Sequence, residues 1–445
     1  MGKCALSFLL HTILITLCES VFIKNIEERL FQQYPCFNTS NGGCDCRYLD
    51  FEDSGVTGSI PASISRCVHL EQLELDRNVI TGTIPVELTE LQSLAILDLE
   101  SNSLTGTLPS EIGDLQSLKY FALSYNDFTG SLPSVLGGCS RLAHLRLRNN
   151  HFTGSIPSEL KLLSSLKEMD LSINQFVGPL PLPTASQNTL DFIDVSANAL
   201  DGFFFADELG QLSRLTSLRL DSNAFTGILP HTVGELLLLR MLSIRDTHMS
   251  GWLPNALGDL KFLRTLTVEG SDFSGSIPSF LGLLSDIEFM NFAGNSLSGM
   301  IPSELGGCNN TWFLSVEDNS LSGTIPSSLV NLGQGTLPDG INAGKLSVGG
   351  NTPGFCGVVP SLRDTMSPPH YLPTSTPNSS VSPSSPTKPS TTATFATRHH
   401  PCHPIHRHHP VTATPVTCIS TFTPSFTFTA TFTTTITSSA LSSRP

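Results

Sequence analysis

Charged and aromatic side chains recur at two-residue spacing in the first third of the chain. The acidic members come first and are Asp50, Glu52, Glu74, Asp76, Asp98 and Glu100. Tyrosine, histidine and arginine follow at Tyr120, Tyr125, His144, Arg146 and Arg148. Carboxylates attract basic groups, and two guanidinium groups on one strand face suit a carboxylate. These residues predict a binding site for an elongated ligand, with the tyrosines as aromatic anchors between two regions of opposite charge.

Sequence patterns that support catalysis are absent. There is no Gly-x-Ser-x-Gly turn, no phosphate-binding loop and no His-Glu-x-x-His pair. The 38 acidic residues outnumber the 24 lysines and arginines, for a formal charge of −14, which disfavours a nucleic-acid partner. We therefore expect a binding protein that has no enzymatic activity, no cofactor and no metal site.

The charged residues belong to a repeat that runs through most of the chain. Each copy contains Leu-x-Leu-x-x-Asn, and we call the last position the column position. It holds Asn78, Asn102, Asn126, Asn150, Asn174, Asn198, Asn223, Asn295 and Asn319, with Ser54, Thr247 and Ser271 in three further copies. Successive copies are 24 residues apart, except for one step of 25 before Asn223. A thirteenth, partial copy ends at Asn351 after an eight-residue insertion.

A repeat of this length and leucine pattern predicts a horseshoe-shaped solenoid. The inward-facing leucines of one copy should be Leu94, Leu97, Leu99 and Leu104. Asp98 lies between two of them on a short strand and should face solvent, because side chains alternate along a strand. The column Asn should satisfy backbone groups where the chain leaves the strand. Thr247 and Ser271 can do so only in part, which predicts looser packing there.

Each copy continues with Gly-x-Ile-Pro or a variant of it. Examples are Gly58-Ser59-Ile60-Pro61, Gly154-Ser155-Ile156-Pro157 and Gly323-Thr324-Ile325-Pro326. This motif resembles the plant-type leucine-rich repeat of receptor-kinase ectodomains, receptor-like proteins and polygalacturonase-inhibiting proteins, over about residues 36–360. The resemblance implies an α/β repeat solenoid with about 13 strands. No kinase sequence follows the repeats, so we expect a protein without a kinase domain.

The resemblance also implies a function. Arg146-Leu147-Arg148 resembles the Arg-x-Arg pair with which some peptide-sensing ectodomains hold a ligand's C-terminal carboxylate. We expect an extracellular recognition module in signalling or defence, which binds a peptide, a protein or a wall oligosaccharide on its concave face, alone or with a co-receptor. The alternative is a structural cell-wall or matrix protein with a glycosylated tail.

Two outer segments depart from the repeat. One reads Pro179-Leu180-Pro181-Leu182-Pro183, and in the next Phe203-Phe204-Phe205 replaces the Ile-Pro pair. Both fit either a bulged convex side or an exposed aromatic contact patch.

The sequence divides into five parts. We expect a signal peptide at 1–20, an N-terminal cap at 21–48, repeats at 49–333, a partial repeat and cap at 334–360 and a disordered Ser/Thr/Pro-rich tail at 361–445. The protein should be secreted, extracellular or in the cell wall, without a transmembrane segment in the mature chain. Glycans are expected at the Asn-x-Ser/Thr sites Asn38, Asn309 and Asn378.

Eleven cysteines are present. Three lie eleven residues before a column position, where other copies have Leu, and should be free buried thiols: Cys67, Cys139 and Cys308. The family usually pairs cysteines at the start of the solenoid, around a Trp that this chain lacks. We expect one bridge within Cys36, Cys44 and Cys46, with the pairing left open.

Overall fold

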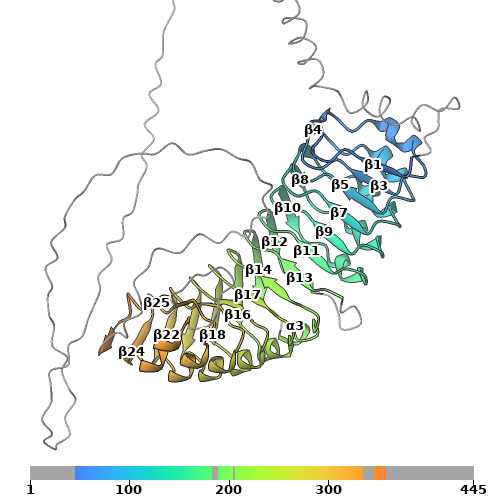
Figure 1. Ribbon diagram of the computed structural model, residues 1–445. Helices are drawn as coiled ribbons and strands as arrows, with labels where there is room; N and C mark the ends of the chain where they lie inside the picture. The colour runs from blue at the N-terminus through green and yellow to red at the C-terminus, as the bar shows by residue number, and fades with distance from the viewer. Residues whose placement is uncertain (1–45, 183–188, 204–205, 334–344, 353, 357–445) are drawn as a thin grey trace, which may run out of the picture.

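The computed structural model describes residues 46–182, 189–203, 206–333, 345–352 and 354–356. These residues form a solenoid with two parallel sheets of thirteen strands each, in which every repeat adds one strand to each sheet (Figure 1). The predicted leucine-rich-repeat fold is therefore confirmed. The signal peptide, Asn38, Asn378, Cys36, Cys44 and the tail lie outside the described residues.

The first sheet contains the strands predicted from the Leu-x-Leu segments. They are β1 (Tyr48–Asp50), β3 (Gln72–Glu74), β5 (Ile96–Asp98), β7 (Tyr120–Ala122), β9 (His144–Arg146), β11 (Glu168–Asp170), β13 (Phe192–Asp194), β15 (Ser217–Arg219), β17 (Met241–Ser243), β19 (Thr265–Thr267), β21 (Phe289–Asn291), β23 (Phe313–Ser315) and β25 (Lys345–Ser347). Leu49 pairs with Leu73 and Leu73 with Leu97, so the 24-residue period sets the register.

The second sheet was not predicted, because each strand is only a few residues of the Gly-containing turn. Its strands are β2 (Thr57–Gly58), β4 (Val79–Gly82), β6 (Ser103–Gly106), β8 (Asp127–Gly130), β10 (His151–Ser155), β12 (Gln175–Gly178), β14 (Ala199–Phe203), β16 (Ala224–Ile228), β18 (His248–Trp252), β20 (Asp272–Gly275), β22 (Ser296–Gly299), β24 (Ser320–Thr324) and β26 (Gly354–Cys356).

Single turns of 3-10 helix return the chain to the first sheet, and a proline precedes each. They are η2 (Ala62–Arg66), η3 (Val86–Glu90), η4 (Ser110–Asp114), η5 (Ser134–Gly138), η6 (Ser158–Leu162), η8 (His231–Glu235), η9 (Asn255–Asp259), η10 (Ser279–Leu283), η11 (Ser303–Gly307) and η12 (Ser327–Asn331). Short connections of this kind are a common use of 3-10 helix. Within the described ranges, only α3 (Ala206–Leu209) is α-helical.

The core lies between the two sheets and these turns. Leu94, Leu97, Leu99 and Leu104 are fully buried, which confirms the predicted inward face. Phe128, Phe152 and Phe176 stack one above the next, with ring centroids 6.0 and 6.1 Å apart. Each repeat therefore buries its apolar face only against its neighbours, as expected of a solenoid.

The column asparagines satisfy backbone groups across repeats, as predicted. Asn126 Oδ1 accepts a hydrogen bond from the Leu104 amide at 2.9 Å, and its Nδ2 donates to the carbonyl of Leu99 at 2.8 Å. Thr247 and Ser271 make fewer such bonds: their hydroxyls lie 3.0 Å apart, and Ser271 also donates to the Ile244 carbonyl.

The residue before the column position is left-handed in all thirteen repeats. It is glycine in three of them, at Gly270, Gly294 and Gly350, but the others include Tyr125 and the β-branched Ile173, whose φ angles are 59° and 55°. Such angles are unfavourable for these residue types. The ladder of column side chains holds them in place.

The expectation for Cys67 is wrong, because this thiol is not free. Cys46 and Cys67 are each disulfide-bonded, whereas Cys139 and Cys308 are free and buried as predicted. Cys67 occupies the core position of the first repeat, which has no preceding repeat to cover it. Burial raises the pKa of the Cys139 and Cys308 thiols to about 11, which makes them unreactive.

Candidate ligand-binding face

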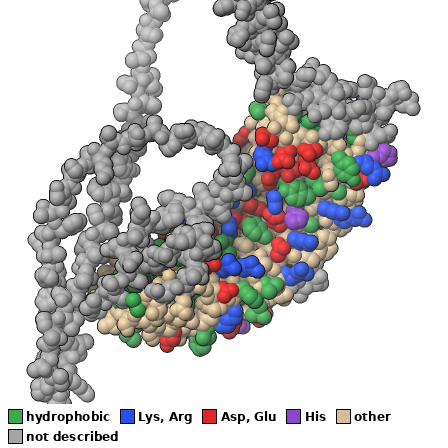
Figure 2. Space-filling model, in the orientation of Figure 1, with side chains coloured by type: hydrophobic (Ala, Val, Ile, Leu, Met, Phe, Trp, Pro, Cys, Tyr) green, Lys and Arg blue, Asp and Glu red, His purple; other side chains and the backbone are tan. Residues whose placement is uncertain are grey.

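The charged residues singled out from the sequence gather on the face of the first sheet. Pairing places Glu74 beside Asp98, Asp98 beside Ala122, and Ala122 beside Arg146. Figure 2 shows the acidic side chains over the N-terminal strands and basic side chains further along the same face. The change of charge along the solenoid that the sequence predicts is therefore present.

We call the six carboxylates Asp50, Glu52, Glu74, Asp76, Asp98 and Glu100 the acidic strip. The Arg77 guanidinium contacts Glu52 and lies 3.2 Å from Asp76. Among the described residues no arginine, lysine or histidine forms an ion pair with Glu74, Asp98 or Glu100. The strip therefore has more negative charge than its own neighbours neutralise.

Burial and mutual repulsion change the acidity of the strip. Partial burial, followed by the neighbouring Asp98 carboxylate, raises the pKa of Asp76 to about 6 despite its contact with Arg77. Burial also raises the pKa of Asp98 to about 6, although the Glu100 amide donates to its carboxylate. The pKa values of Glu74 and Glu100 are raised in the same way, chiefly by burial. A basic ligand group would relieve this repulsion.

Next to the strip lies a cluster of four side chains on β7, β9 and β11. Arg146 donates through Nε and Nη2 to both carboxylate oxygens of Glu168, at 2.8 and 2.9 Å. Its Nη1 donates to the Tyr120 hydroxyl at 2.7 Å. His144 Nδ1 is 2.8 Å from Glu168. Burial alone would raise the pKa of Glu168, but the hydrogen bonds from Arg146 and His144 lower it below the usual value.

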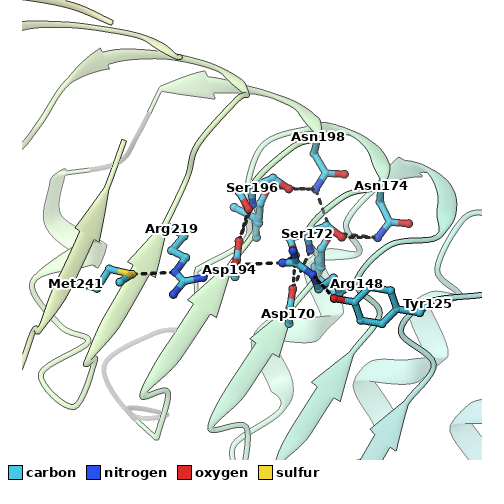
Figure 3. Close-up of polar contacts among 12 residues, drawn as sticks. Tyr125, Arg148, Asp170, Ser172, Asn174, Asp194, Ser196, Asn198, Arg219 and Met241 are labelled. Atoms are coloured by element: carbon cyan, nitrogen blue, oxygen red, sulfur yellow. Dashed lines mark hydrogen bonds and ion pairs between the residues drawn. The ribbon is translucent and has the colours of Figure 1, made fainter. Parts of the chain in front are cut away.

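Arg148 is held in a second cluster, which Figure 3 shows in close-up. Its Nε donates to the Tyr125 hydroxyl at 3.1 Å and its Nη1 to the Ser172 hydroxyl at 2.9 Å. The Asp194 carboxylate, almost fully buried, is 3.9 Å from Arg148 and 3.4 Å from Arg219. Arg219 also directs Nε at the sulfur of Met241, 2.9 Å away. The Asp194 carboxylate therefore lies close to two guanidinium groups.

The structure therefore brings Tyr120, His144 and Arg146 together, and joins Tyr125 to Arg148. The sequence interpretation missed the carboxylates that neutralise the arginines, Glu168 and Asp194. Glu168 lies one repeat further on, in register with His144, and Asp194 lies two repeats further on, in register with Arg146. This register is the signal that could have identified them. A ligand carboxylate at either arginine would have to share it with one of them.

The remaining predicted site residue that can be placed is Asn309. It is exposed on a turn directly after η11, where a glycan could extend into solvent, and its glycosylation stays a prediction. The side chains of Phe203, Phe204 and Phe205 lie outside the described residues. Within the part of the chain that the structure covers, no helix has the length and hydropathy needed to cross a membrane.

Known proteins share this repeat architecture. The leucine-rich-repeat family model matches residues 68–128 and 92–152. No curated protein sequence matches the chain. Among solved structures, the ectodomain of the Arabidopsis receptor kinase HAESA in complex with an IDA peptide hormone is 32% identical, with a TM-score of 0.61, over 69% of this chain and 54% of that one.

Two other solved structures are similar to the same extent. A TDR receptor is 31% identical with a TM-score of 0.63, over 68% of this chain and 50% of that one. The plant peptide hormone receptor RGFR1 in complex with RGF2 is 28% identical with a TM-score of 0.61, over 68% of this chain and 51% of that one. The chain spans about half the length of these ectodomains. By its repeat, its paired sheets and these matches, the chain is a leucine-rich-repeat protein similar to plant receptor-kinase ectodomains.

Proposed function

We propose that the protein is an extracellular recognition module that binds a peptide or a protein segment along the face of the first sheet. The segment would place basic side chains on the acidic strip and continue over Tyr120 and Tyr125. Binding, rather than catalysis, suits an extended face whose side chains are spread over many strands. Its role would be in signalling or defence.

The observation that carries the proposal is the uncompensated charge of the strip. Glu74, Asp98 and Glu100 are half-buried, lie on adjacent repeats and have no ion-pair partner among the described residues. Leaving carboxylates in this state costs folding free energy. A ligand amine or guanidinium placed over them would recover that energy. This makes a basic segment the favoured ligand chemistry.

The similar ectodomains give independent support for a peptide ligand. HAESA and RGFR1 are described in complex with peptide hormones IDA and RGF2. Such complexes would place the protein outside the cell.

The tyrosines and arginines contribute a second element to the proposal. Arg146 fixes the hydroxyl of Tyr120, and its guanidinium lies 5.2 Å from the centre of that ring. Arg148 fixes Tyr125 in the same way. The two rings are therefore held in place as anchors, and an acidic ligand group would compete with Glu168 and Asp194 for the arginines.

A random peptide library displayed on phage tests the proposal on the full chain. We expect enrichment of peptides rich in Lys and Arg, whose binding weakens as salt increases. The triple variant Glu74→Gln/Asp98→Asn/Glu100→Gln should weaken an enriched peptide by roughly tenfold to a hundredfold. The matched control removes the same charge from the outer turns, as Glu111→Gln/Glu159→Gln/Glu304→Gln, and should bind as the parent does.

Two results would contradict the proposal. Enriched peptides without basic residues would reject the ligand chemistry. Equal losses in the two triple variants would show that only net charge matters. Replacing Arg146 by Ala separates the arginine's role. The variant leaves Glu168 with only its His144 contact and should not weaken a basic peptide, whereas a peptide held through its carboxylate should lose affinity.

A further inference from the structure

One side chain per repeat forms a continuous row on the second sheet. It is the residue between Gly and Ile or Leu in the Gly-x-Ile-Pro turn, and it leans over the turn glycine of the next repeat. The contact is close: a Cβ at Gly275 would lie 2.7 Å from Trp252 Cδ1, and one at Gly251 would lie 2.8 Å from Ile228 Cγ2. We call this row the ridge. The members whose side chains the structure describes are Ser59, Thr83, Thr107, Ser131, Ser155, Pro179, Ile228, Trp252, Ser276, Met300 and Thr324.

The chemistry of the ridge changes along the solenoid. The first five members are Ser or Thr, whereas large apolar side chains occupy it at Ile228, Trp252 and Met300. These three are 61%, 77% and 66% exposed and are the most exposed large hydrophobic side chains of the described residues. The fold does not require them, because hydroxyl residues serve at the same position elsewhere. Large exposed apolar side chains gathered in this way mark an interaction surface.

The surface around these side chains is nearly neutral. The row beside the ridge consists of hydroxyl residues, and Ser250 and Ser274 donate to the carbonyls of Gly227 and Gly251. The nearest charges described on these strands, His248 and Asp272, lie 3.7 Å from each other. The chain as a whole has a formal charge of −14, so two copies repel each other in general. At the nearly neutral surface around the ridge, two copies could come into contact without this electrostatic repulsion.

The order of side chains along the ridge is self-complementary. The small side chain of Ser276 leaves a notch in the ridge between Trp252 and Met300, one repeat from each. A two-fold axis midway between Trp252 and Ser276 would place Trp252 of each copy over Ser276 of the other. The same axis would bring Ile228 of one copy against Met300 of the other. A large residue meets a small one and an apolar residue meets an apolar one, as an isologous interface requires.

We propose that the apolar part of the ridge, centred on Trp252 and Ser276, is the contact through which two copies of this chain form a dimer. Ile228 and Met300 are three repeats apart, about 14 Å at the spacing of adjacent strands. Anchors this close together bury less than the roughly 800 Å² per partner of a standard interface. The dimer is therefore weak and reversible, with a Kd on the order of 10 µM.

Sedimentation equilibrium of the full chain tests this proposal between about 1 and 100 µM. We expect a monomer at the low end and mostly dimer at the high end. Trp252→Asp should abolish the dimer without changing the melting temperature, since the side chain is exposed. Thr107→Asp introduces the same charge on the hydroxyl part of the ridge and should leave the dimer intact. A monomer throughout for the parent chain would overturn the proposal.

Two further variants test the arrangement itself. Ser276→Trp fills the notch and adds exposed apolar surface, yet it should weaken the dimer at least tenfold, because Trp252 of the other copy loses its place. Stronger association of this variant would show non-specific adhesion and refute the notch. The double variant Ile228→Cys/Met300→Cys should form a covalent dimer on mild oxidation, beyond the level in the parent chain or in Thr107→Cys. Absence of that cross-link in a sample that sediments as a dimer would reject this axis.

Discussion

Replacing Asn126 with Ala should destabilise the solenoid far more than its small volume suggests. The side chain is 6% exposed and bonds three backbone groups at 3.0 Å or less: the Leu104 amide and the carbonyls of Leu99 and Leu123. Alanine leaves the buried Leu104 amide without an acceptor. The Leu99 and Leu123 carbonyls each lose one bond but keep another, from Asn102 and Asn150 respectively. At about 1–1.5 kcal/mol for each of the three lost bonds, the expected cost is about 3–4.5 kcal/mol.

The matched comparison is Thr247→Ala, at the same position of another repeat. The Thr247 hydroxyl has one contact at 3.0 Å, with Ser271, and a longer one at 3.4 Å with the Met249 amide. Its loss should cost about 1–2 kcal/mol. Urea unfolding followed by circular dichroism gives both free energies, and hydrogen exchange should show faster exchange at Leu104 only in the Asn126 variant. Equal costs, or unchanged exchange at Leu104, would refute the bonding account.

Three further predictions concern stability. Folding raises the pKa values of Asp76 and Asp98 to about 6, so the folded state binds more protons than the unfolded state. Stability should therefore fall by about 1–2 kcal/mol, after allowance for solvent screening, as pH rises from 5 to 7.5. Thermal melts should show this fall, and the Asp76→Asn/Asp98→Asn variant should show a smaller one, because Glu74 and Glu100 still contribute. Ile173→Asn should raise the free energy of unfolding by about 1 kcal/mol, because Asn tolerates the left-handed φ of 55°; a loss in urea titration would contradict this. Leu97→Ala should cost roughly 2–5 kcal/mol, whereas Asp98→Ala should lower stability by no more than about 0.5 kcal/mol; similar losses in melting temperature would show that the strand register is wrong.

The repeat and its core residues could be predicted from the sequence because each repeat packs against a near copy of itself. Once Leu97 and Asn126 were assigned inward positions, the 24-residue period fixed their partners in the neighbouring repeats. The limited hydrogen bonding at Thr247 and Ser271 followed from the reach of a hydroxyl. These inferences need only backbone geometry.

The site was harder to predict because it depends on how far long side chains extend between strands. Arg146 was expected to be available to a ligand, but Glu168 on the next strand binds it at two points. Cys67 illustrates a different limit. The repeat predicts an ordinary core residue, whereas the first repeat of an array has no preceding copy and uses that position for a disulfide.

The two hydroxyl residues of the column also bear on how the array unfolds. In a one-dimensional stack, cooperativity passes only between nearest neighbours, and the weakest coupling decides where unfolding halts. Thr247 and Ser271 lie on successive repeats, so the amide ladder is interrupted between Asn223 and Asn295. We expect the solenoid to consist of two cooperative units joined at β18 and β20. Mechanical load on the C-terminal unit would then detach it while the acidic strip and both arginine clusters stayed folded.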